Sequence, residues 1–378
     1  MAKWYVLWGA LAVVVLSLTG FGIWVLNLPP TPTGLEAPPI AEAETDAMLA
    51  SLKPPKRQRP LVAVIGINDA TETNDYVVPT GILRRADIAD VVMLATGPGP
   101  VQLYPALQVE PDTTVAAFDA EHPEGADYVI VPAMSRDDDP VVLAWLRNQA
   151  AKGARIIGVC AGAKVVAAAG LLDGHRATTH WYYLRELLKR NPSITYVADR
   201  RMVSDDGVTT TTGITAAMPM MLTLIEAIAG RAKAESIAHD LGIEQWNAQH
   251  ASGAFKLTRP FATTVLLNRM AFWNRDTWGI ELRPGMDEVA LALVADAWSR
   301  TYRSAATTFA PATSAVVTAN GVRVVPDQNA TDWPEDRRVS TFPDRRPADA
   351  LDRALGDISE RYGEATTNVV AMQLEYPR

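Results

Sequence analysis

The stretch RIIGVCAG at residues 155–162 decides the fold, because it places Cys160 at the end of an apolar run with Gly158 and Gly162 two residues to either side. The spacing G-x-C-x-G is typical of a nucleophile on a sharp strand-to-helix turn, where the glycines relieve the crowding of a strained backbone. The following helix is expected to lower the pKa of the thiol through its positive amino end. The alternative is that Cys160 is one more buried core residue.

Apolar runs and helix-like stretches alternate on both sides of this turn. Predicted strands cover residues 61–65, 91–94, 128–131 and 155–159, and predicted helices cover residues 78–86, 140–152 and 163–171. Strands that are apolar on both faces and separated by helices predict an α/β fold with a doubly wound, mostly parallel sheet. In such sheets ligands collect at the carboxyl ends of the strands, where Cys160 stands.

Length and composition exclude several classes of protein. The 378 residues are enough for about two domains of ordinary size. The net charge of −8 disfavours nucleic-acid binding. Cys160 is the single cysteine of the sequence, so an intrachain disulfide is excluded. The five histidines show no metal-binding spacing, and neither a metal nor an organic cofactor is implied.

The N-terminal segment is strongly apolar. Residues 4–28 carry no charged side chain and are numerous enough to cross a membrane as a helix. Residues 1–28 are therefore predicted to be an uncleaved single-pass anchor in the cell membrane. Lys3 precedes the apolar stretch, and the charged residues in 29–50 are all acidic. This distribution of charge predicts a cytoplasmic N-terminus and an extracytoplasmic location for the bulk of the chain. A cleaved signal peptide is the alternative. The proline-rich residues 29–59 are expected to form an extended tether.

Three stretches carry a family resemblance. They are residues 154–169 around the cysteine, residues 170–181 (GLLDGHRATTHW) and residues 207–226 (GVTTTTGITAAMPMMLTLIE). In these stretches the chain resembles the ThiJ/PfpI family of the class I glutamine amidotransferase-like superfamily, and within it the branch of isonitrile hydratases and AraC-associated regulators. The resemblance covers about residues 60–235 and implies a flavodoxin-like domain.

The resemblance also implies a set of site residues. By position, Cys160 would be the nucleophile and His180 the histidine beside it, which would stabilise the thiolate or move a proton. The family places an acid against the thiol, and Asp75 matches that position better than Glu72. A carboxyl that shares a proton with the sulfur would have a raised pKa. The alternative role of Asp75 is to cap the helix that follows it.

Acyl chemistry at Cys160 would need backbone donors for a developing oxyanion. The N–H of Ala161 is one candidate and that of Ala133 or Met134 is the other, although relatives often carry Gly-Gly at the second place. Tyr182 stands where glutamine amidotransferases have the glutamate of their Cys-His-Glu triad, so amidotransfer is disfavoured.

Residues 236–378 lie outside the resemblance and are predicted to form an α+β extension of unknown role. The patterns predict a helix within 285–304, a hairpin with a type I′ turn at Asn320-Gly321 and a final helix near 351–362. An excess of acidic over basic residues disfavours a DNA-reading role. Packing on the first domain, dimerisation and covering of the Cys160 pocket are the open alternatives.

The sequence as a whole predicts a membrane-anchored, extracytoplasmic, cysteine-dependent enzyme of the ThiJ/PfpI type. It would be a hydrolase, a hydratase or a glyoxalase-like lyase acting on a small electrophile. Expected partners are a small-molecule substrate or ligand, the membrane through residues 4–28 and a second copy of the chain, but no nucleic acid. A second hypothesis is a non-catalytic sensor in which Cys160 binds a ligand or is oxidised. The third is a domain like that of transcription regulators.

Overall fold

A seven-stranded sheet forms the centre of the molecule. The computed structural model describes residues 2–377, and for helix α1 (Ala2–Leu26) it describes only part of the side chains. The strands of the sheet are β1 (Leu61–Gly66), β3 (Asp90–Ala95), β6 (Thr113–Thr114), β7 (Tyr128–Val131), β8 (Arg155–Gly158), β11 (Met202–Asp205) and β12 (Val208–Thr211). Their order is β11-β12-β8-β7-β1-β3-β6, and only β11 and β12 pair antiparallel. The prediction of a mostly parallel, flavodoxin-like sheet is confirmed.

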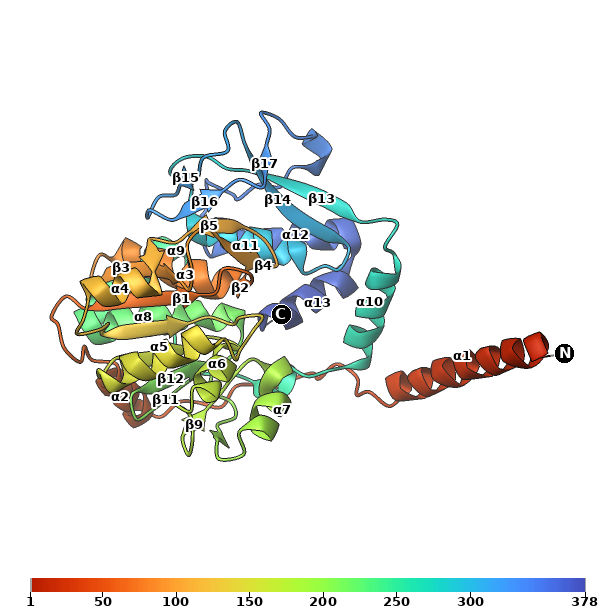
Figure 1. Cartoon of the computed structure of the whole chain (residues 1–378), viewed down its shortest axis with the longest axis horizontal. Helices are drawn as coiled ribbons and strands as arrows, with labels where there is room; N and C mark the ends of the chain where they lie inside the picture. Colours follow the sequence, from red (N-terminus) through yellow and green to blue (C-terminus); the bar gives the residue numbers. More distant parts are fainter. Residues whose placement is uncertain (1, 378) are drawn as a thin grey trace.

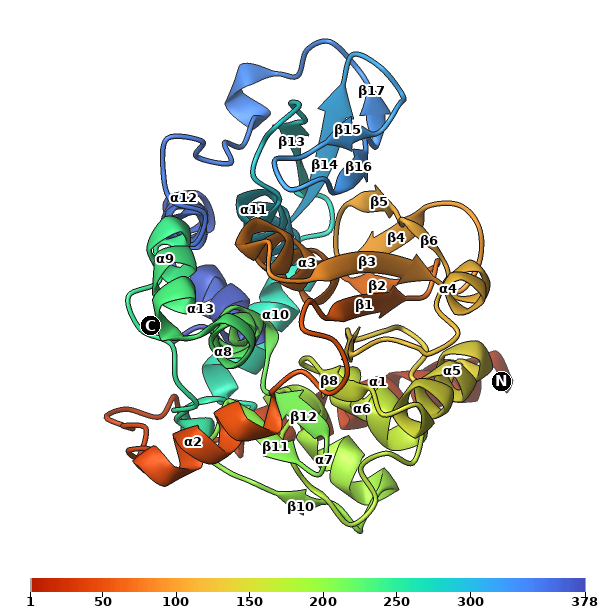
Figure 2. The ribbon, with the colours of Figure 1, turned by 90° about the vertical axis from the view of Figure 1, so that its left-hand side faces the viewer.

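Helices cover both faces of this sheet (Figures 1 and 2). The helices of the first 241 residues that pack on or beside it are α3 (Thr73–Ala86), α4 (Val115–Glu121), α5 (Pro140–Ala151), α6 (Gly162–Ala168), α7 (Trp181–Arg190), α8 (Ala217–Ala229) and α9 (Arg231–Leu241). Alternate residues of β1 enter two different cores. Val62 and Val64 pack with α3 and α8, whereas Ala63 and Ile65 pack with α4, α5 and α6. Each central strand is therefore apolar on both sides, as a doubly wound sheet requires.

The C-terminal third lies against α3. Its elements are α10 (Arg259–Met270), β13 (Asp276–Glu281), α11 (Glu288–Ser299), β14 (Ser304–Ala310), β15 (Val316–Val317), β16 (Arg323–Val325), β17 (Gln328–Asn329), α12 (Asp349–Tyr362) and α13 (Glu364–Leu374). Helix α11 is buried over residues 288–298, because it contacts α3, β14 and α12 (Figure 2). The predicted helices in 285–304 and 351–362 are confirmed, and α13 is an additional helix.

One small sheet joins the two parts of the chain. The predicted hairpin is present, because β15 and β16 pair antiparallel, but its turn is not of type I′, since Gly321 has a positive φ and Asn320 does not. Strand β16 also pairs with β5 (Gln108–Glu110), which continues to β4 (Val101–Tyr104) and β2 (Thr71–Glu72). A second small sheet pairs β9 (Arg176–Ala177) with β10 (Thr195–Tyr196). Helix α9 runs across residue 235, and a domain boundary there stays a prediction.

The N-terminal predictions require a correction. A helix needs about 20 consecutive apolar residues to cross the hydrocarbon core of a bilayer. In the part of the chain that the structure describes, no helix meets this combination of length and hydropathy. The predicted transmembrane anchor at residues 1–28 is therefore wrong, and so is the single-pass location in the cell membrane with an extracytoplasmic bulk.

Residues 29–59 also differ from the extended tether that their prolines predict. They contain helix α2 (Glu42–Ser51) and continue into Leu52, whose side chain is buried in the main core. The buried carboxylate of Asp127 then accepts hydrogen bonds from the backbone N–H groups of Lys56 and Arg57, at 3.1 and 3.0 Å. This segment is consequently fixed to the folded body rather than held apart from it.

Candidate functional site

Cys160 occupies a strained turn between β8 and α6. Its φ is +57°, in the left-handed region that residues with a Cβ atom rarely adopt. A Cβ atom at Gly162 would lie 1.9 Å from the carbonyl oxygen of Val131, so only glycine fits there. The N–H of Cys160 donates to Oγ1 of Thr211 at 3.1 Å, and its carbonyl accepts from Oγ1 of Thr179 at 3.0 Å. The turn is thus held in place from two other segments of the chain.

The thiol of Cys160 is buried, with 3% of the residue exposed. Burial raises its pKa well above the usual value, and the negative charges of Asp75, Glu72 and Glu375 raise it further. A hydrogen bond from the backbone N–H of Ala161 acts in the opposite direction. The prediction that the amino end of the following helix lowers the pKa of the thiol is therefore wrong. Desolvation raises this pKa by more than the short helix α6 can lower it.

Asp75 lies in the first turn of α3, which begins at Thr73 rather than near residue 78. The helix cap is Glu72, whose Oε2 accepts the backbone N–H of Asp75 at 2.6 Å. The carboxyl of Asp75 is therefore not used as a cap. Its Oδ2 accepts the N–H of Ala133 at 3.1 Å, whereas its buried Oδ1 has no hydrogen-bond partner. Burial raises the pKa of Asp75 from 3.8 to about 7.

These contacts bear on the two predicted oxyanion donors in different ways. The N–H of Ala161 faces the sulfur of Cys160, where an oxyanion donor is needed. The N–H of Ala133 is occupied by the carboxyl of Asp75 and serves an oxyanion only after that bond breaks. Both assignments stay predictions.

His180 is engaged at both of its ring nitrogens. Its Nδ1 accepts the N–H of Tyr182 at 3.1 Å and caps helix α7, while Nε2 lies 2.9 Å from the carbonyl oxygen of Gln373. The acceptor role of Nδ1 requires that Nε2 carries the proton. Burial lowers the pKa of the ring, which favours this neutral form. A proton-shuttling role for His180 therefore needs release of Gln373, and it stays a prediction.

The C-terminal third contributes a buried cation that sequence reasoning missed as a site residue. Arg300, just after α11, contacts Oε1 of Glu72 through Nη2 at 2.7 Å and Oδ1 of Asp296 through Nε at 2.5 Å. The other carboxyl oxygen of Asp296 accepts from the side-chain amide of Asn74. The sequence signal was a basic residue in the last turn of a helix, which predicts only an interaction with the helix dipole.

Glu375 is a second missed residue, and it follows the end of α13. Its Oε1 accepts the N–H of Trp181 at 2.6 Å, and its Oε2 accepts the N–H of Gly213 at 2.7 Å. A Cβ atom at Gly213 would lie 2.7 Å from the side chain of Glu375, so position 213 also requires glycine. Nε2 of His250 lies 3.6 Å from Oε2.

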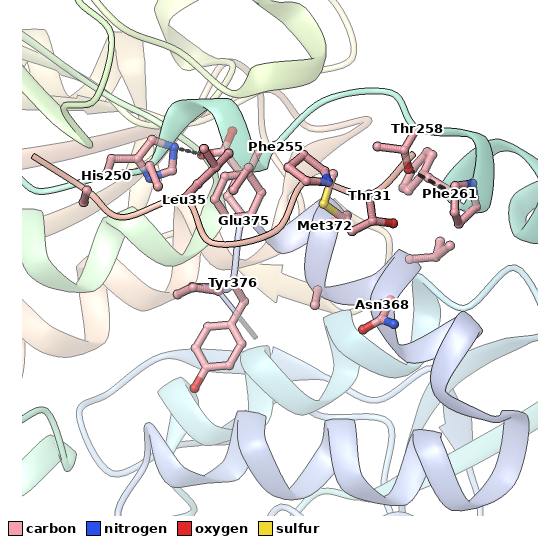
Figure 3. A pocket seen from close by; sticks show the side chains of 18 of the residues that line it. Thr31, Leu35, His250, Phe255, Thr258, Phe261, Asn368, Met372, Glu375 and Tyr376 are labelled. Atoms are coloured by element: carbon pink, nitrogen blue, oxygen red, sulfur yellow. Dashed lines mark hydrogen bonds and ion pairs between the residues drawn. The ribbon is translucent and has the colours of Figure 1, made fainter. Parts of the chain in front are cut away.

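A pocket of about 1320 Å³ is lined in part by Glu375 (Figure 3). Its walls come from residues 31–37, from residues 245–264, from the chain beyond residue 363, and from Arg201 and Asp352. Glu375 and His250 lie at one end of it, and Cys160 is not among its lining residues. Glu375 thus lines this pocket and also influences the pKa of Cys160. Among the described residues, no group of three or more His, Cys, Asp or Glu side chains is arranged to hold a metal ion.

The fold and the site define an α/β protein with a cysteine on a strand-to-helix elbow beside a buried acid. Residues 62–227 match the model of the DJ-1/PfpI family. Isonitrile hydratase of Pseudomonas putida is 37% identical over 160 residues, which are 41% of this chain and 67% of that protein. The chain therefore belongs to the DJ-1/PfpI family, and the ThiJ/PfpI resemblance of the sequence is confirmed.

Other similar proteins also cover about half of the chain. Protein dj-1beta of Drosophila melanogaster is 27% identical over 184 residues, which are 47% of this chain and 95% of that protein. The crystal structure of Drosophila melanogaster DJ-1beta aligns with 50% of this chain and all of its own, at 25% identity and a TM-score of 0.45. The crystal structure of an AraC family transcriptional regulator from Pseudomonas putida covers 48% of this chain and 98% of its own, at 21% identity and a TM-score of 0.42.

Proposed function

We propose that this protein is a cysteine-dependent enzyme of the DJ-1/PfpI family, a hydratase, hydrolase or glyoxalase-like lyase that acts on a small electrophile such as an isonitrile. The observation that carries the proposal is the pairing of a strained elbow cysteine with Asp75, a buried acid that acts electrostatically on its sulfur. The 37% identity to an isonitrile hydratase supports this substrate class.

The chemistry is an addition of the Cys160 thiol to an electrophilic carbon. The sulfur forms a bond to that carbon, while Asp75 in its protonated form gives its proton to the substrate atom that becomes electron-rich. The proton lost by the sulfur returns to Asp75, so the acid ends the step unchanged. The N–H of Ala161 stabilises the developing negative charge. Water then releases the product and restores the thiol.

A Cys160→Ser and Asp75→Asn pair tests this function. With isonitriles, methylglyoxal and small amides as substrates, loss of the acid should reduce turnover by about 10²–10⁴-fold and loss of the thiol should abolish it. Turnover that persists without the cysteine would exclude the proposal. Asp344→Asn, at a side chain that is 78% exposed, serves as the control for handling of the protein.

A second candidate is a sensor, and it is favoured by the occupied N–H of Ala133, which leaves acyl chemistry without its second oxyanion donor. In this role Cys160 reacts with peroxide to give a sulfenic acid and water, and with a second peroxide to give a sulfinic acid. Mass spectrometry after mild peroxide treatment separates the candidates. Stoichiometric sulfinic acid without turnover of any substrate selects the sensor. A homodimer and the absence of nucleic-acid binding stay predictions.

A further inference from the structure

A segment of the N-terminal part of the chain lies along the pocket of about 1320 Å³. Residues 31–37 form one wall of this pocket, and we call them the strap (Figure 3). At the first end of the strap, the carbonyl oxygen of Pro29 accepts the backbone N–H of Arg259 at 2.8 Å. At the second end, the carbonyl oxygen of Pro38 accepts the side-chain amide of Gln249 at 3.3 Å. The strap therefore crosses the pocket between two attached points.

The walls of the pocket carry apolar side chains from three segments of the chain. These side chains include Leu35 from the strap, Phe255 and Phe261 from residues 245–264, and Val369 and Met372 from α13. The ring of Phe255 is stacked on that of His250, with ring centroids 5.1 Å apart and an angle of 6° between the planes. Removal of apolar ligand surface from water is favourable by about 25 cal/mol per Å². The pocket therefore suits a ligand with an apolar body.

A cation lines the end of the pocket that holds His250 and Glu375. Arg201 acts electrostatically on His250, and Glu375 acts on Arg201 in turn. Nε of Arg201 donates to the carbonyl oxygen of Gln249 at 2.7 Å. In the part of the chain that the structure describes, its two Nη groups have no hydrogen-bond or ion-pair partner. Because a guanidinium keeps its charge and binds a carboxylate through two parallel N–H bonds, Arg201 offers a site for an anionic group.

The acidic side chains of the wall do not neutralise Arg201 by direct contact. Glu375 accepts two backbone N–H groups, at 2.6 and 2.7 Å, and no ion pair joins it to Arg201 among the described residues. Asp352 and Glu364 lie at exposed positions, and each accepts a hydrogen bond from a hydroxyl group, at 2.7 and 2.6 Å. Water and salt screen such exposed charges. At the buried end, an anionic ligand group would therefore pair with Arg201, whereas a cationic one would be repelled by it.

We propose that this pocket binds an amphipathic monocarboxylic acid, with its carboxylate on the two Nη groups of Arg201 and its apolar body against Leu35, Phe255 and Phe261. This is a second site, because Cys160 is not among the lining residues. Apart from Arg201, the lining residues also lie outside residues 62–227, which match the family model. The inference therefore goes beyond the proposed function and does not depend on it.

Isothermal titration calorimetry of the full-length protein tests the ligand class. The probes are decanoate, decanol and decyltrimethylammonium, which share an apolar chain and differ in the charge of the head group. Decanoate should bind about 10-fold or more tightly than decanol, because hydrogen bonds between charged groups are the strong ones. Decyltrimethylammonium should bind more weakly than decanol. Equal affinities for acid and alcohol, or a preference for the ammonium compound, would overturn the proposal.

Variants of Arg201 test where the carboxylate lies. Arg201→Met should abolish the preference for decanoate over decanol and leave the affinity for decanol nearly unchanged. Arg201→Lys should restore only part of the preference, because an ammonium group lacks the planar pair of donors. Arg283→Met is the matched control, at an arginine that is 69% exposed and does not line the pocket, and it should change neither affinity. A preference for decanoate that survives in Arg201→Met would contradict the assignment.

Hydrogen exchange in the wild-type protein locates the site even if Arg201→Met does not fold. Decanoate should slow the exchange of backbone N–H groups in the strap, because the bound chain lies between the strap and residues 245–264. Binding without protection of the strap would place decanoate elsewhere and overturn the proposal. Cys160→Ser should bind decanoate as the wild type does, and loss of binding in this variant would show that the two sites are one. If decanoate binds as expected but no substrate is turned over, this inference stands and the proposed enzyme function fails.

Discussion

The carboxylate of Glu375 accepts the backbone N–H of Trp181 at 2.6 Å, which ties the end of α13 to the start of α7. A second N–H, that of Gly213, reaches the other carboxylate oxygen at 2.7 Å. Since α7 begins beside the candidate site, this contact fixes the last residues of the chain next to Cys160. The C-terminal third is thereby part of the surroundings of the thiol.

Removal of this contact should loosen the site. Glu375→Ala leaves the buried N–H of Gly213 and the partly buried N–H of Trp181 without an acceptor, and each buried unsatisfied donor costs about 1–3 kcal/mol of stability. Urea denaturation should show a loss of about 2–6 kcal/mol, towards the lower end because Trp181 is only partly buried, and the exposed Glu360→Ala should show almost none. Alkylation of Cys160 should also become faster in Glu375→Ala, because the variant removes a negative charge that raises the pKa of the thiol. An unchanged alkylation rate would show that Glu375 does not act on the Cys160 thiol.

The pH dependence of stability should report on Asp75. Its folded pKa of about 7 lies above the ordinary 3.8. Between these values the folded state keeps a proton that the unfolded state releases, so stability falls as pH rises, by up to about 1.4 kcal/mol per pH unit for this group. Asp75→Asn should flatten the curve between pH 4 and 7, whereas Asp344→Asn, at a side chain that is 78% exposed, should not. Equal slopes in wild type and Asp75→Asn would contradict the raised pKa.

The reaction rate of Cys160 should rise with pH, whereas the stability contributed by Asp75 falls. Because burial and nearby acids raise its pKa, alkylation by iodoacetamide should accelerate about tenfold per pH unit throughout pH 7–9 without levelling off. Asp75→Asn should move the profile to lower pH, since it removes the largest of the negative charges that act on the sulfur. A plateau below pH 8 in the wild type would show that the thiol is already ionised.

The stability of the turn at Cys160 should depend on the side chain of Thr211. Its Oγ1 accepts the N–H of Cys160, which has a strained φ of +57°. Thr211→Val removes the acceptor at nearly constant volume and should destabilise the fold by about 1–3 kcal/mol, whereas Thr211→Ser should retain most of the stability. Chemical denaturation measures both. Similar losses in Val and Ser variants would assign the effect to the γ-methyl group instead of the hydrogen bond.

Local patterns were sufficient to predict the sheet and its elbow. The four predicted strands lie within one residue of β1, β3, β7 and β8, because apolar runs and glycine spacing are properties of neighbouring residues. The start of α3 was misjudged because a glutamate, Glu72, acts as its cap and is not among the strongly preferred cap residues.

The missed part of the site depends on contacts between distant segments. Nothing in the sequence around Arg300 indicates that it pairs with Glu72, since that pairing depends on how α11 packs against α3. The same holds for Glu375, whose hydrogen-bond donors, the N–H groups of Trp181 and Gly213, lie on two other segments. The error at residues 1–28 had a different cause. The length of the uncharged stretch and the charges beside it were used to infer a membrane span that the described helices do not provide.

The small sheet that joins β16 to β5 has a consequence for synthesis of the protein. The Cys160 elbow is made before β16, Arg300 and Glu375, so the nascent chain first holds its thiol with Glu72 and Asp75 already present but without the cation and the carboxylate from the C-terminal third. Domains fold as they emerge, N-terminal part first. The growing chain therefore passes through an interval in which the elbow exists but Arg300 and Glu375 are not yet in place around it.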